Sequence, residues 1–74
     1  MPFIVWSKQN CPQCEQAKQL LKSKGYQYEV RTIDGVQWTR DDLLKVAPEA
    51  RAVPQIFNED KLIGGISELK AELE

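Results

Sequence analysis

The chain has 74 residues and a formal net charge of −1, from ten Lys and Arg against eleven Asp and Glu, and it contains two cysteines and no histidine. Residues 1–74 are expected to form a single small domain. The balanced charge gives no polycationic surface for nucleic acid or an anionic membrane. No apolar run approaches the roughly 18–20 residues of a membrane span. The lack of histidine excludes Ser-His-Asp and Cys-His hydrolases, and two cysteines cannot supply the four ligands of a structural zinc site.

The first half of the chain predicts a strand, a helix and a second strand. Residues 3–6 are a short β-branched and aromatic run that suits a buried strand. Residues 11–24 have helical spacing, with Pro12 at the first helical position and Gly25 as the left-handed stop. Residues 28–33 alternate as a second strand. The inward-facing residues of the helix are expected to be Cys14, Ala17, Leu20 and Leu21.

The second half predicts a helix, a hairpin and a final helix. Thr39, with Asp42 three residues later, is typical of a helix N-terminus, and the apolar stripe that follows consists of Leu43, Leu44 and Val46. Residues 55–58 and 62–63 flank a tight turn at residues 59–61, which indicates a hairpin. Ser67 is expected to cap a last helix that carries Leu69 and Leu73. A parallel strand pair, its crossover helix and an antiparallel hairpin make a small α/β layer structure.

The segment Cys11-Pro12-Gln13-Cys14 carries the chemistry. It falls where a predicted strand gives way to a predicted helix. Cys11 is therefore expected at the helix N-terminus, where unpaired backbone N–H groups and the positive end of the helix dipole favour a thiolate. Lys8 adds a nearby positive charge, and Cys14 lies one turn further on, closer to the core. We expect Cys11 to be the attacking thiolate and Cys14 the resolving thiol, with exchange through a mixed disulfide.

Two other interpretations of the cysteine pair stay open at this point. One is a structural disulfide, although closing so short a loop constrains the unfolded chain very little. The other is a metal or iron–sulfur site, whose missing ligands would have to come from a second subunit or from small thiols. A Cys-x-x-Cys segment that opens a helix directly after a strand favours a redox motif over both.

Three separated segments resemble the glutaredoxin family. Residues 11–14 are similar to the active-site motif of that family, and residues 51–57 resemble its segment with a cis-proline beside the redox site. Residues 63–68 resemble the double-glycine turn before its last helix, and the whole resemblance runs over residues 3–73. It implies a minimal thioredoxin-like α/β fold, β-α-β-α-β-β-α, in which a four-stranded mixed sheet has helices on both faces.

The same resemblance implies glutathione as co-substrate, with no tightly bound cofactor and no metal. The γ-glutamyl carboxylate would bind N–H groups that open the last helix, and the glycyl carboxylate would pair with Lys8. Extended backbone at Val53, before a cis peptide bond to Pro54, would pair with the backbone of the bound peptide. The glutathione-binding residues implied in this way are Lys8, Gln13, Val53, Pro54, Gly65, Ile66 and Ser67.

The chain departs from the family pattern at three positions. Gln13 replaces a common Tyr between the cysteines, and Ala52 stands where Thr commonly precedes Val-Pro. Ser67, followed by Glu68, stands where Asp commonly begins the last helix. These changes weaken the side-chain part of glutathione recognition and leave its backbone part intact.

The expected function is reduction of protein disulfides with both cysteines and of protein–glutathione mixed disulfides with Cys11 alone. The expected state is a cytoplasmic monomer with no targeting segment, and the resemblance implies ribonucleotide reductase as a client. The departures at Gln13 and Ala52 keep open a dithiol donor recharged by thioredoxin reductase. An iron–sulfur carrier, with a cluster between two Cys11 thiolates and two glutathiones, is disfavoured by Pro12. A non-enzymatic binding module would need an unreactive Cys11.

Overall fold

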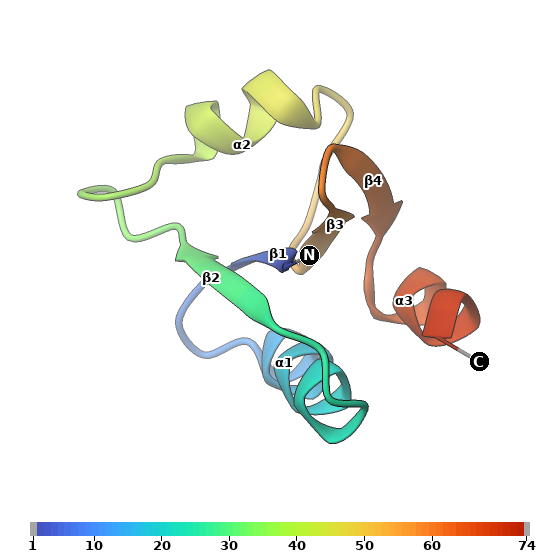
Figure 1. The fold of residues 1–74 in the computed structure, drawn as a ribbon. Helices are drawn as coiled ribbons and strands as arrows, with labels where there is room; N and C mark the ends of the chain where they lie inside the picture. The colour runs from blue at the N-terminus through green and yellow to red at the C-terminus, as the bar shows by residue number, and fades with distance from the viewer. Residues whose placement is uncertain (1, 74) are drawn as a thin grey trace.

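A mixed four-stranded sheet in the order β2-β1-β3-β4 forms the middle layer of the computed structural model, which describes residues 2–73 (Figure 1). The strands are β1 (Phe3–Ser7), β2 (Tyr28–Thr32), β3 (Gln55–Asn58) and β4 (Lys61–Gly64). β1 pairs parallel with β2 and antiparallel with β3, and β3 pairs antiparallel with β4. This is the α/β order that the sequence predicts.

Three helices cover the two faces of the sheet. They are α1 (Pro12–Ser23), α2 (Arg40–Val46) and α3 (Ile66–Leu73). In Figure 1, α1 and α3 lie below the sheet and α2 lies above it. The prediction of helices on both faces is therefore confirmed. No helix within residues 2–73 is long and apolar enough to cross a membrane.

The alternation of side chains along the strands divides the core into two clusters. Phe3 and Val5 of β1 belong to the cluster between the sheet and helices α1 and α3, together with Leu21 and Leu69. The other cluster lies on the α2 side, and its buried members are Trp6, Leu43, Ala47 and Phe57. Each face of the sheet is thus covered by its own helices, α1 and α3 on one face and α2 on the other.

Capping at both ends of α1 follows the sequence prediction. Cys11 is the N-cap with extended backbone, Pro12 is the first helical residue, and Gly25 follows the helix with a φ of 80°. The inward face of α1 consists of the buried residues Cys14, Ala17 and Leu21, with Leu20 partly buried. The start of α2 is also as predicted, because Thr39 and Asp42 form a reciprocal capping box.

Three local predictions were wrong. Val46 is 50% exposed, and Ala47, just past the end of this short helix, is buried in its place. Lys61 belongs to β4, so the hairpin turn is shorter than expected. Ser67 does not cap α3, because the helix already begins at Ile66 and the Leu69 N–H donates to the Gly65 carbonyl oxygen.

Candidate redox site

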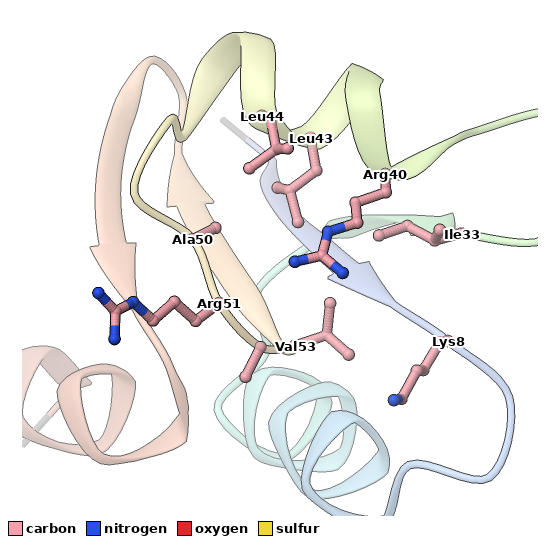
Figure 2. Close-up of a pocket in the computed structure, with 9 residues that line it drawn as sticks. Lys8, Ile33, Arg40, Leu43, Leu44, Ala50, Arg51 and Val53 are labelled. Atoms are coloured by element: carbon pink, nitrogen blue, oxygen red, sulfur yellow. The ribbon is translucent and has the colours of Figure 1, made fainter.

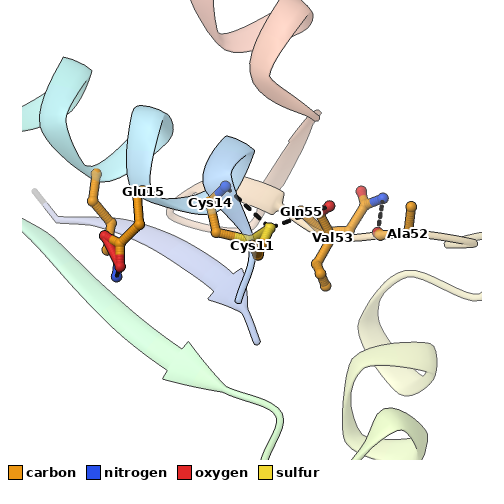
Figure 3. The surroundings of a disulfide bond; sticks show 7 residues. Cys11, Cys14, Glu15, Ala52, Val53 and Gln55 are labelled. Atoms are coloured by element: carbon orange, nitrogen blue, oxygen red, sulfur yellow. Dashed lines mark hydrogen bonds and ion pairs between the residues drawn. A yellow bond between two sulfur atoms is a disulfide. The ribbon is translucent and has the colours of Figure 1, made fainter. Parts of the chain in front are cut away.

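Cys11 and Cys14 form a disulfide at the N-terminus of α1 (Figure 3). Sγ of Cys11 accepts the backbone N–H of Cys14 at 3.1 Å, so the sulfur occupies the position of a capping side chain. An N–H group directed at this sulfur, at the positive end of the helix dipole, stabilises negative charge there. The strand-to-helix position inferred from the sequence therefore produces the expected local geometry.

The two cysteines differ in exposure. Cys14 is 1% exposed and packs on the inner face of α1, whereas Cys11 is half-buried. Only Cys11 is thus open to a partner disulfide in solution. The expectation that Cys14 lies closer to the core is confirmed.

The loop before β3 lies against the sulfur of Cys11. The Val53–Pro54 peptide bond is cis, as the family resemblance implied, and Pro54 is buried. The carbonyl oxygen of Val53 lies 3.9 Å from Sγ of Cys11. Residues 42 positions apart in the chain therefore meet at the reactive sulfur.

The double-glycine turn lies beside this loop. A β-carbon on Gly65 would lie 3.7 Å from the Pro54 carbonyl oxygen, so backbone meets backbone there. The carboxylate of Glu68 accepts the Gly65 N–H at 2.9 Å. The next two N–H groups, of Ile66 and Ser67, begin the helix and have no carbonyl one turn back to bond. The fold thus places all three sequence segments around one point.

A cationic hollow of about 150 Å³ lies on the other side of Val53 (Figure 2). Lys8 and Arg40 line it, and neither forms an ion pair with another described residue. In Figure 2 the Arg40 side chain points into the hollow from α2, Lys8 approaches from the end of β1, and Arg51 points away. Apolar side chains complete the wall: Ile33, Leu43, Leu44, Ala50 and Val53.

Arg40 is the residue of this site that sequence reasoning missed. It is the first residue of α2, directly after the capping residue Thr39. The backbone N–H of Thr39 bonds the Asp42 carboxylate and, with the Thr39 hydroxyl and the charge of Lys45, holds the pKa of Asp42 below its ordinary value. The capping signal located the helix, but nothing local indicated that its first side chain would line the same hollow as Lys8.

The remaining predicted site residues differ in their surroundings. Gln13 is exposed on the first turn of α1, and its side chain makes no hydrogen bond to another described residue. Ser67 is exposed at the start of α3. Within residues 2–73 no group of three His, Cys, Asp or Glu side chains is arranged to hold a metal ion.

The sequence and the fold both match known redox proteins. The family model described as Glutaredoxin matches residues 3–63. The chain belongs to the glutaredoxin family. Membership of this family makes the chain a thiol–disulfide oxidoreductase.

Individual glutaredoxins agree with this assignment over most of their length. Glutaredoxin 3 of Escherichia coli (strain K12) is 39% identical over 67 residues, which are 90% of this chain and 80% of that protein. A probable glutaredoxin of Synechocystis sp. is 38% identical over 69 residues, 93% of this chain and 76% of that one.

Solved glutaredoxins share the fold. The reduced E. coli glutaredoxin superposes with a TM-score of 0.82 at 29% identity, over 99% of this chain and 93% of that chain. A buckwheat glutaredoxin–glutathione complex superposes with a TM-score of 0.80 at 28% identity, over 97% of this chain and 67% of that chain.

Proposed function

We propose that this chain uses glutathione as reductant, and that it reduces protein disulfides and protein–glutathione mixed disulfides. Cys11 is the attacking thiolate in this proposal and Cys14 the resolving thiol. The observation that carries it is the hollow lined by Lys8 and Arg40, next to the Val53 carbonyl that lies 3.9 Å from the Cys11 sulfur. The buckwheat glutaredoxin that is solved with glutathione supports the choice of ligand.

The single-cysteine reaction needs two thiol exchanges at Cys11. Its thiolate attacks the glutathione sulfur of a mixed disulfide, and the protein thiolate leaves and takes a proton from water. A second glutathione thiolate then attacks that glutathione sulfur, which releases oxidised glutathione and restores the Cys11 thiolate. The Cys14 N–H at 3.1 Å stabilises negative charge on the Cys11 sulfur, and so favours it both as the thiolate and as the leaving group.

The two-cysteine reaction ends in the disulfide seen in the structure. Cys11 attacks a protein disulfide and forms a mixed disulfide with the client. Cys14 then attacks the Cys11 sulfur and releases the client as a dithiol. The Cys14 side chain lies within bonding reach of the Cys11 sulfur. Because it is only 1% exposed, it is shielded from thiols in solution.

Glutathione has two carboxylates, and the site offers a positive feature on either side of Val53 and Pro54. Lys8 and Arg40 would pair with the glycyl carboxylate in the hollow. The N–H groups of Ile66 and Ser67 would hold the γ-glutamyl carboxylate, since Glu68 already occupies the Gly65 N–H. The extended backbone at Val53 would pair with the peptide between them.

Reductase-coupled turnover tests the proposal against its main alternative. The protein and an excess of a disulfide substrate are supplied either with glutathione, glutathione reductase and NADPH or with thioredoxin reductase and NADPH. Efficient NADPH consumption in the glutathione system, without thioredoxin reductase, is the expected result. Turnover that requires thioredoxin reductase would contradict the proposal and favour the alternative that the departures at Gln13 and Ala52 suggest.

A further inference from the structure

The guanidinium of Arg31, on β2, contacts two indole rings outside the redox site. Its Cζ lies 4.5 Å from the centroid of the Trp38 ring and 5.3 Å from that of Trp6. The two rings meet edge to face, with centroids 5.2 Å apart. Glu29 accepts a hydrogen bond from Nε of Arg31 and so orients the guanidinium. A cation held against two aromatic rings attracts both, so Arg31 ties Trp38 to the sheet.

Trp38 fixes the point at which the chain enters α2. The four residues before it, 34–37, are all exposed, so no side chain there anchors the loop in the core. The Trp38 carbonyl oxygen accepts the N–H groups of Asp34 at 3.2 Å and Gly35 at 3.1 Å, and Trp38 forms a β-bridge with Ile33. Backbone hydrogen bonds thus join the start of the loop to Trp38 at its end. The contacts of the Trp38 ring with Arg31 and Trp6 then hold this residue against the sheet.

Arg40 follows two residues later and points into the hollow beside the redox site (Figure 2). Helix α2 has seven residues and buries one of them, Leu43, so its own packing fixes its orientation weakly. Contacts just before its first turn therefore have a large share in placing the Arg40 guanidinium. Lys8, by contrast, comes directly from the end of β1 and needs no such support.

We propose that Arg31 is a positioning residue for substrate binding, acting through Trp38 on Arg40. The inference rests on the proposed function, in which the hollow receives the glycyl carboxylate of glutathione. Arg31 then sets the affinity for the glutathione moiety and leaves the chemistry at Cys11 unchanged. Arg31, Trp6 and Trp38 together form what we call the indole clamp.

The test is single-turnover release of the peptide thiol from a glutathionylated peptide by the reduced protein, as a function of peptide concentration. Arg31→Met should raise the half-saturating concentration about fivefold and leave the limiting rate unchanged. Trp38→Leu should do the same, and Trp38→Phe, which keeps a ring, should recover most of the affinity. Lys61→Met removes an exposed cation on β4 and is the matched control.

A double mutant separates positioning from a direct effect of the Arg31 charge. If Arg31 acts through Arg40, then Arg31→Met combined with Arg40→Met should bind no more weakly than Arg40→Met alone. Additive losses, or a fall in the limiting rate with unchanged affinity, would overturn the inference. An effect of Arg40→Met without any effect of Arg31→Met would also overturn it and leave the proposed function standing.

A truncated substrate supplies the remaining control. With a peptide joined to γ-glutamylcysteine, which lacks the glycyl carboxylate, the clamp variants should match the parent protein. Equal losses with both substrates would mean that the indole clamp supports the fold and not the carboxylate site, and would contradict the inference. If Arg40→Met itself changes nothing with either substrate, the proposed function fails at the hollow, and the inference fails with it.

Discussion

Sγ of Cys11 accepts the backbone N–H of Cys14 at 3.1 Å, although the Cys14 side chain is itself buried in the core. The first turn of α1 therefore stabilises one sulfur through its backbone while it shields the other. This asymmetry supports the proposed division of roles, in which Cys11 attacks and Cys14 resolves.

Replacement of each cysteine by serine should separate the two proposed reactions. Cys11→Ser should abolish reduction of both protein disulfides and glutathionylated peptides, because it removes the attacking sulfur. Cys14→Ser should lose the reduction of protein disulfides and retain deglutathionylation, which uses Cys11 alone. Both activities are measured with glutathione and glutathione reductase. Full activity of Cys11→Ser in either assay would refute the assignment.

Removal of charge in the hollow should weaken the binding of glutathionylated peptides. Lys8→Met and Arg40→Met should each raise the half-saturating concentration about fivefold, since each removes one cation that lines the hollow proposed for the glycyl carboxylate. The difference from the parent protein should shrink as salt is added, because the site is open to solvent. Lys22→Met, on the exposed side of α1, should behave as the parent protein does.

Much of this site could be predicted because its signals are local. The change from an apolar strand to a helix with Pro12 at its first position placed Cys11 at the cap, and this is the observed geometry. The spacing of Thr39 and Asp42 likewise located the start of α2. In each case the cap itself is closed by a bond within one helical turn, between Cys11 and Cys14 or between Thr39 and Asp42.

The features that sequence reasoning missed depend on contacts between distant segments or on competition between local signals. Arg40 and Lys8 line the same hollow although they are far apart in the chain, and no local pattern encodes that placement. Ser67 is a good capping residue, but the Glu68 carboxylate bonds the Gly65 N–H, and the helix begins before Ser67. Val46 is apolar but half exposed, because the buried positions are Leu43 within α2 and Ala47 just past its end.

Two carboxylates that accept backbone N–H groups, one in the loop before α2 and one in its capping box, should make stability depend on acid pH. Backbone N–H groups lower the pKa of Asp34, chiefly that of Val36, and the Thr39 N–H does the same for Asp42, from an ordinary value of 3.8. The folded state thus favours both ionised carboxylates. Their contribution is complete well above pH 3.8 and is lost as the pH falls below it. Urea unfolding across this range measures the effect.

Variants of the capping box should isolate one of the two carboxylates. Asp42→Asn should flatten part of the dependence on pH. Thr39→Ala should lower the free energy of unfolding by about 1 kcal/mol at neutral pH, because it removes the hydroxyl that accepts the Asp42 N–H. An unchanged acid profile in Asp42→Asn would contradict this account of the helix start.

The last residue of β4, Gly64, should tolerate a side chain poorly. Its φ is +126°, and a β-carbon there would lie 2.8 Å from Oε1 of Glu68, the atom that caps Gly65. Gly64→Ala should therefore lower the free energy of unfolding by about 2 kcal/mol, from backbone strain and the displaced cap together. Gly25→Ala is the matched control, because Gly25 has a φ of +80° with nothing within 4 Å, and it should cost about 1 kcal/mol. Equal losses in urea unfolding would mean that Glu68 moves aside freely and that its bond to Gly65 contributes nothing to stability.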